Sequence, residues 1–153
     1  MSKWTHLAGL VRIDYIGHLV NRFQPFGEKY IIDVFKEGRP MGSEIGALLH
    51  VNHWKQCDIY ELKRDAVDEN CEGAAYWGDL SISADLRDFG EEKSDIDSVV
   101  EWFKKACVEL CELYKGAFIR QAILQIEVEY GNTFVVSYVG NKWQIAEIPE
   151  NWE

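Results

Sequence analysis

The chain has 153 residues, 47% of them hydrophobic and 13% aromatic, with 26 acidic residues against 16 basic ones and a net charge of −10. This composition excludes a disordered chain and fits one domain, because a second core needs roughly 50 residues or more of its own. The acidic balance argues against nucleic acid as a partner, since such binding needs an electropositive face.

No stretch approaches the roughly 20 apolar residues that cross a bilayer, and the N-terminus lacks the basic-then-apolar pattern of a secretory signal. We therefore expect a cytoplasmic protein with no membrane partner. The four cysteines lack CxxC spacing, which disfavours a metal site, and they are expected to be free structural thiols. Their positions are Cys57, Cys71, Cys107 and Cys111.

The first half of the chain alternates between strand and helix signals. Apolar residues on alternate positions predict a strand over residues 4–16, and helical spacing before Gly38 predicts a short helix over residues 28–37. Glycines and Pro40 predict a loop over residues 39–46, and residues 47–54 follow as a strand. Residues 55–73 are polar and charged, without a sustained period.

The second half begins with an alternating strand at residues 74–86. Residues 94–114 then carry an amphipathic helix, for which Ser94 is the expected N-cap and Gly116 the stop. Trp102 stands one step from the apolar stripe and is expected to matter less than Phe103. The stripe consists of Ile96, Val99, Val100, Phe103, Ala106, Cys107, Leu110, Cys111 and Tyr114.

Two tight turns divide the C-terminal third, at Gly131-Asn132 and at Gly140-Asn141, so residues 118–130 and 142–148 flank a further strand. The order of elements predicts an α+β fold, a ferredoxin-like βαββαβ antiparallel sheet with an added C-terminal hairpin and one long helix packed on it. A meander with one helix is the alternative if residues 28–37 are not helical. We assign residues 1–148 to a single domain and 149–153 to a tail.

Catalytic and cofactor signatures are absent from the sequence. His50 and His53 are three apart on a predicted strand, so their side chains should point to opposite faces and should not share a metal ion. No nucleophile elbow or phosphate-binding loop is present. We therefore predict no catalytic residues, no metal and no cofactor.

Two polar segments beside strands are candidates for recognition. One is residues 41–46, where Ser43 offers a hydroxyl and Glu44 a carboxylate. The other is residues 85–90, where Arg87 can pair with Asp85 or Asp88 or can instead anchor an anionic group of a ligand or partner. The candidate binding residues are Ser43, Glu44, Asp85, Arg87 and Asp88.

These segments, together with the stretches Gly78-Asp79-Leu80-Ser81-Ile82 and Glu101-Trp102-Phe103-Lys104, resemble a family of small proteins encoded by bacteriophages and prophages. The shared pattern is a Met-Gly-Ser-Glu loop and a strand that ends in Asp-Leu-Arg-Asp, over roughly residues 40–105. The family has no assigned reaction, so the resemblance implies phage origin and the cytoplasm of the host cell, but no chemistry.

Three functions remain open at this stage. The first is a non-enzymatic phage accessory protein that binds and blocks a host protein, such as a defence factor, or a small nucleotide signal. The second is an enzyme acting on a nucleotide or phosphoester, with Arg87 holding the anion and His50 or His53 as general acid or base. The third is an assembly protein whose exposed strand edges form a homo-oligomer.

Overall fold

The structure, a computed structural model, describes residues 3–16, 26–40, 43–56 and 76–150, except for the side chains at 43–47, 53, 55 and 56. The predicted succession of strands and helices is confirmed, including the short helix that excludes the one-helix meander. In chain order, the elements are β1 (Trp4–Tyr15), α2 (Glu28–Lys36), β2 (Ser43–Gln56), β3 (Tyr76–Arg87), α4 (Lys93–Leu113), β4 (Ala117–Val128), β5 (Thr133–Val139) and β6 (Lys142–Ile148).

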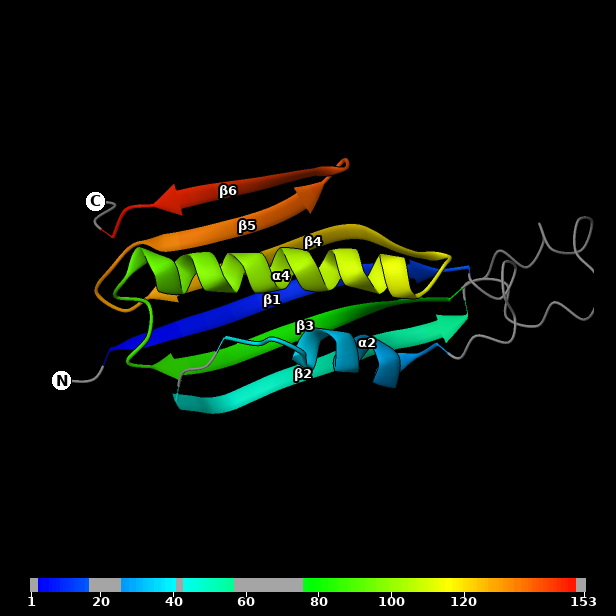
Figure 1. The fold of residues 1–153 in the computed structure, drawn as a ribbon, viewed down its shortest axis with the longest axis horizontal. Helices are drawn as coiled ribbons and strands as arrows, with labels where there is room; N and C mark the ends of the chain where they lie inside the picture. Colours follow the sequence, from blue (N-terminus) through cyan, green and yellow to red (C-terminus); the bar gives the residue numbers. More distant parts are fainter. Residues whose placement is uncertain (1–2, 17–25, 41–42, 57–75, 151–153) are drawn as a thin grey trace, which may run out of the picture.

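All six strands join one sheet in the order β2-β3-β1-β4-β5-β6, with every neighbouring pair antiparallel (Figure 1). The predicted ferredoxin-like fold is wrong for this chain, because this six-stranded order is not that of a simple ferredoxin-like sheet. The C-terminal hairpin is not an appendage: β4 pairs with β1 on one side and with β5 on the other, and Val136 of β5 is fully buried. The core therefore extends past β4, and β6 forms the sheet edge.

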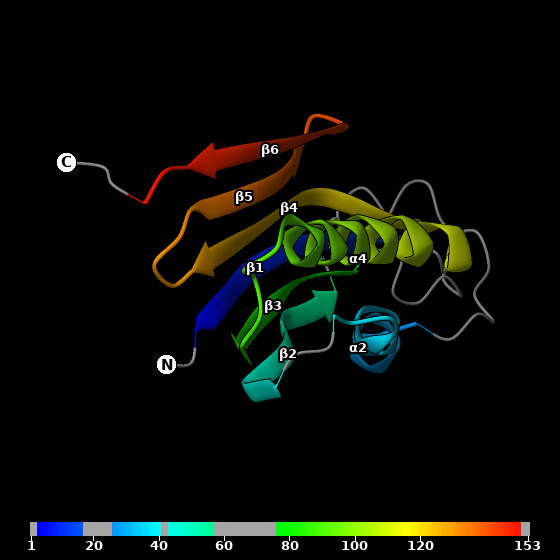
Figure 2. The same ribbon diagram turned by 60° about the vertical axis from the view of Figure 1, so that its left-hand side comes forward.

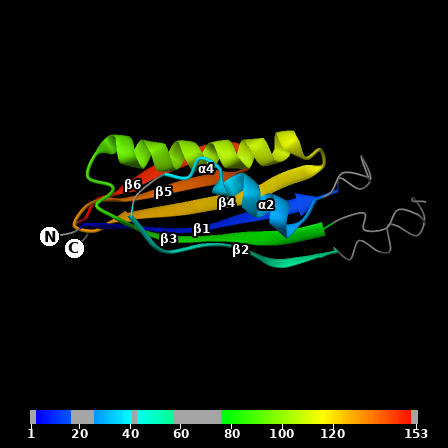
Figure 3. The same cartoon turned by 60° about the horizontal axis from the view of Figure 1, so that its bottom comes forward.

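Both helices lie on the same face of the sheet (Figure 3), where α4 runs along the strands over the centre and the shorter α2 lies beside it over β2 and β3. Alternation in β1, β3 and β4 sends every second side chain into the layer between sheet and helices. The fully buried side chains of this core include Val11, Ile13, Leu80, Val99, Phe103, Leu110, Leu124 and Ile126.

Trp102 is part of this core, although it stands one step outside the predicted apolar stripe. It is 7% exposed, and its indole Nε1 donates a hydrogen bond of 3.0 Å to the backbone oxygen of Phe35 at the end of α2. The ring of Phe35 also packs edge-on against Trp102. Trp102 therefore joins the two helices, because α2 lies on the side of α4 next to the predicted stripe.

The start of α4 also differs from the prediction. The helix begins at Lys93 after Glu92, with no side-chain cap, so Ser94 is not the N-cap. Its hydroxyl instead donates to Glu92, while the carboxylate of Asp95 accepts a hydrogen bond of 3.0 Å from the backbone of Gly90. An acidic residue in the first turn thus ties the helix to the preceding turn.

Candidate functional site

The face of the sheet opposite the helices carries no helix among the described residues (Figure 3). We call this surface the open face. Its side chains come from the strand positions that alternate with the core, and they form rows across neighbouring strands. One of these rows crosses its centre, where Leu10 of β1 lies opposite Ile123 of β4.

The centre of the open face is apolar and accessible. Leu10 is 45% exposed and Ile123 is 47% exposed. Ser81 of β3 stands opposite Leu10 on one side, and Ser137 of β5 stands opposite Ile123 on the other. The row therefore places two large apolar side chains between two small hydroxyl groups.

One flank of the open face is a cluster of charges around an indole. Arg120 Nε donates to Asp14 at 2.6 Å, and Arg12 Nε donates to the same carboxylate at 3.3 Å. The guanidinium carbon of Arg12 also lies 4.3 Å from the centre of the Trp77 ring, which is a cation–π contact. The two arginines on this flank are thus held by a shared carboxylate.

The other flank contains the predicted site. Arg87 Nε is 3.7 Å from a carboxylate oxygen of Asp88, which is one of the two predicted partners of this arginine. Asp85 has a different partner, because its Oδ1 lies 2.5 Å from Nδ1 of His6 on β1. No sequence motif marks His6, and the two residues are 79 positions apart, so only the strand pairing reveals this contact.

The sheet register brings the two predicted segments together. Residue Ser43 pairs with Arg87, and Glu44 pairs with Leu86. The expected loop over residues 39–46 is therefore corrected, because β2 already begins at Ser43, and Met41 and Gly42 lie outside the described residues. Ser43, Asp85, Arg87 and Asp88 accordingly occupy one end of the β2-β3 pair.

Residues 88–90, at the end of the second predicted segment, have a structural role. The backbone nitrogen of Asp88 donates to the oxygen of Lys3, and the hydroxyl of the buried Thr5 donates to the oxygen of Phe89, which is itself buried. Gly90 has a φ of +96°, and a side chain there would overlap the Thr5 hydroxyl. Residues 88–90 thus form a turn fixed against the start of β1, in which Phe89 and Gly90 are buried and Asp88 is exposed beside Arg87.

The enzyme hypothesis required Arg87 and a histidine to act on one group. His50 pairs with Ser81, six positions before Arg87 along β3. At about 3.3 Å per residue, this separates the two positions by roughly 20 Å. His50 and Arg87 therefore do not converge on a single phosphate. The side chain of His53 is not among those that the structure describes.

The two cysteines that the structure describes are free thiols on α4, as predicted, whereas Cys57 and Cys71 lie outside the described residues. Burial raises the pKa of both the Cys107 and the Cys111 thiol, so neither is a ready nucleophile at neutral pH. Within residues 3–16, 26–40, 43–56 and 76–150, no group of three His, Cys, Asp or Glu side chains is placed to hold a metal ion.

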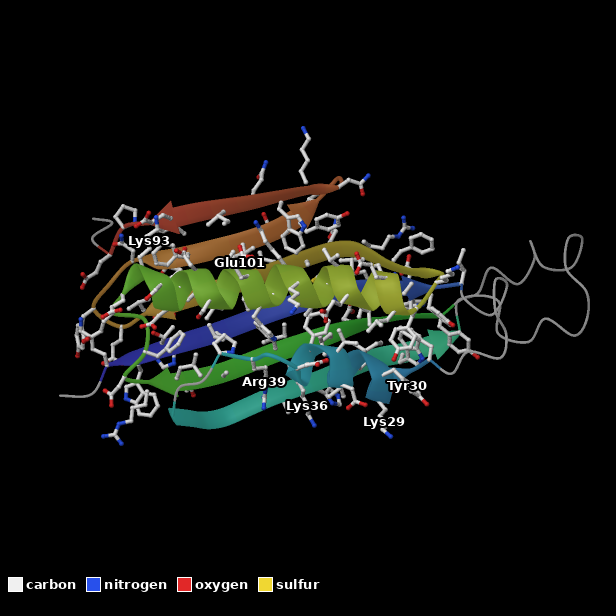
Figure 4. All side chains as sticks on the ribbon, viewed as in Figure 1. Lys29, Tyr30, Lys36, Arg39, Lys93 and Glu101 are labelled. Carbon is white, nitrogen blue, oxygen red and sulfur yellow. The ribbon has the colours of Figure 1, made fainter. Side chains whose placement is uncertain are left out.

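The helix side offers a hollow of about 570 Å³ between the end of α4 and the C-terminal hairpin. Aromatic rings of Tyr138 and Trp143 line it together with the charged residues Glu112 and Lys115. Elsewhere on this side, exposed charges of both signs, such as Lys36 on α2 and Glu101 on α4, border the helices (Figure 4). Because Glu112 also lines the hollow, its charge works against a phosphate ligand there.

Comparisons with protein-family models, with curated proteins and with solved structures found no match for this chain. Among the described helices, none has the length and apolar character needed to cross a lipid bilayer.

Proposed function

We propose that this chain is a non-enzymatic phage accessory protein that binds a host protein through the open face and thereby blocks it. The suggestion of a phage origin rests on the resemblance of residues 40–105. The binding role rests on one observation: the face opposite the helices presents exposed Leu10 and Ile123 at its centre, with paired charges on both flanks.

An apolar centre inside a polar rim is the usual anatomy of a protein–protein interface. Apolar side chains in the middle gain from losing water, while paired charges at the rim fix orientation with little desolvation. A flat six-stranded face also suits a large partner better than a small one, because small ligands need a concave site that surrounds them.

The charges of this face favour a protein over a nucleotide as the partner. A nucleotide phosphate needs cationic groups directed at it. Here Arg12 and Arg120 are both turned toward Asp14, and Arg87 stands beside Asp88. Each arginine already has a carboxylate within 4 Å, which lowers the positive potential that a phosphate would meet.

The test is affinity capture from a bacterial host lysate with wild type, Leu10→Lys and Ile145→Lys as baits. Leu10 lies at the centre of the open face, and Ile145 is a comparably exposed apolar residue on the edge strand β6. We expect one host protein to be retained by wild type and by Ile145→Lys, and to be lost with Leu10→Lys. The open face is not the binding surface if Leu10→Lys retains that protein as well as wild type does.

The predicted rim residues give a graded second test with the captured protein. We expect Arg87→Ala to weaken binding about tenfold, as loss of an interfacial arginine commonly does, and Ser43→Ala to weaken it less. Thermal unfolding should change little for both, because exposed positions usually contribute about 0.5 kcal/mol or less. Titration calorimetry of each variant checks the order, and equal affinities for wild type and Arg87→Ala would remove this end of the sheet from the interface.

A further inference from the structure

Among the described residues, no bulge, proline or helix shields the edge strand β6. It pairs with β5 in an unbroken register from Thr133 opposite Ile148 to Val139 opposite Lys142, without a bulge. No proline interrupts its seven residues, and it lies beyond the helices at the margin of the sheet (Figures 1 and 2). Natural proteins normally blunt such an edge with bulges, prolines, inward charges or a covering element, because its unpaired backbone groups can recruit another strand.

The hairpin turn fixes which backbone groups of β6 point outward. Gly140 and Asn141 have φ values of 59° and 63°, which is the geometry of a two-residue turn that closes on a hydrogen-bonded pair, here Val139 and Lys142. Hydrogen-bonded and non-hydrogen-bonded pairs alternate along an antiparallel ladder. The residues whose N–H and C=O groups face the free edge are therefore Trp143, Ile145 and Glu147.

This set of three residues is symmetric about Ile145. We propose that two copies of the chain pair through antiparallel β6 strands. The two-fold axis is perpendicular to the sheet and passes between the two Ile145 residues. In that register, Ile145 faces Ile145 of the second copy, and Trp143 faces Glu147 of the second copy. Each facing pair exchanges both of its hydrogen bonds, so every outward backbone group of the strand is satisfied.

The side chains favour the same register. Ile145 is 52% exposed on the face that bears the helices, and the pairing buries its side chain against its own copy. On the other face, Lys142 stands opposite Ile148 of the second copy. No like charges therefore face each other across the axis.

A second copy fits this edge better than an unrelated strand does. The outward groups repeat symmetrically about one residue, and the half-exposed side chain of Ile145 meets its own copy at that residue. The dimer joins the two sheets into one continuous sheet with all helices on one side. It leaves both open faces accessible, so the pairing and the proposed host binding can occur together or separately.

Sedimentation equilibrium over a wide range of protein concentration tests the pairing. We expect the mass of wild type to rise toward that of two chains, the mass of Ile145→Lys to stay at one chain because two like charges would meet on the axis, and Leu10→Lys to behave like wild type. The proposal is overturned if wild type remains a single chain at all concentrations, or if Leu10→Lys rather than Ile145→Lys abolishes the association.

Hydrogen exchange on wild type keeps the test independent of any variant's folding. The amides of Trp143, Ile145 and Glu147 should become protected only as concentration rises, while those of Gln144 and Ala146, which are bonded to β5, should be protected throughout. Uniform protection at all concentrations, or association without this alternation, would place the contact elsewhere.

Discussion

The two edges of the sheet are built differently. β2 is 14 residues long, its pairing with β3 shifts twice, between Ile45 and Leu48 and between Asn52 and Lys55, and α2 lies over it. β6 has seven residues in one unbroken register and no described helix above it. Bulges twist an edge away from other strands. β2 is therefore protected within its own chain, whereas β6 has neither of these two protections among the described residues.

The same contrast runs through the packing of the two halves of the sheet. Beside β2, the helices are joined by Trp102 and Phe35, which are both buried. Beside β6, Trp143 is only partly buried, although its ring contacts Phe103 and Tyr138. The free energy of unfolding should thus depend more on the α2 half than on the hairpin half.

The largest loss of unfolding free energy is expected where α2 packs against α4. Phe103→Ala and Trp102→Ala should each lower the free energy of unfolding by about 3 to 5 kcal/mol, because each removes a large buried side chain and leaves a cavity. Urea unfolding of both variants measures this. A much smaller loss for Trp102→Ala would show that α2 is only loosely attached, and the contrast between the halves would disappear.

The hairpin half should respond less. Trp143→Ala removes two aromatic contacts from a ring that solvent partly reaches, and we expect a loss of about 2 kcal/mol. The same urea titration applies, in dilute protein where chains do not associate. A loss equal to that of Phe103→Ala would mean that α4 covers the hairpin as fully as it covers the centre.

Alkaline pH probes the contact between α4 and the hairpin through Cys107. Burial raises the pKa of this thiol above its ordinary value of 9.0, so the folded chain holds the proton more tightly than the unfolded chain does. Its contribution to stability is complete below pH 9 and falls at higher pH, by about 1.4 kcal/mol at pH 10. We expect wild type to lose that much more than Cys107→Ala between pH 8 and pH 10, measured as the urea unfolding free energy. Parallel pH profiles would indicate that solvent reaches the thiol.

The smallest change in unfolding free energy is expected at the edge strand β6. Ile145→Ala should change the unfolding free energy of the dilute chain by about 0.5 kcal/mol or less, because half of the side chain is already in water. Its cost should appear instead at high concentration, as weaker association. A large loss in dilute solution would mean that Ile145 is a core residue of the single chain.

Local sequence patterns predicted the strands and turns that are determined by residues close together in the chain. Alternation located β1, β3 and β4, and the predicted turn at Gly140-Asn141 located the β5-β6 hairpin. The predicted two-residue turn at Gly131-Asn132 is wrong, because β4 already ends at Val128 and the left-handed residue of the connection is Tyr130. The start of β2 was missed because Gly42 and Gly46 are typical of a loop, whereas pairing with β3 holds this segment as a strand. The role of Trp102 was missed because its partner Phe35 belongs to another element.

The candidate site was predictable only in part, for the same reason. Asp85 and Arg87 were found as charged residues at a strand end, but the histidine that binds Asp85 comes from β1. The exposed pair of Leu10 and Ile123 has no local signal, because an apolar residue at a solvent-facing position looks like any other apolar residue until the sheet register is known.

The central position of β1 has a consequence for synthesis on the ribosome. This strand precedes both of its neighbours in the chain, and β3 at residues 76–87 and β4 at residues 117–128 emerge much later. Ribosomes add roughly 5 to 20 residues each second, so β1 waits for seconds without a partner on either side. Such non-local pairing also slows folding once the chain is complete. Both edges of β1 stay unpaired until β3 emerges, and one stays unpaired until β4 emerges, so we expect chaperones to occupy these edges in the interval.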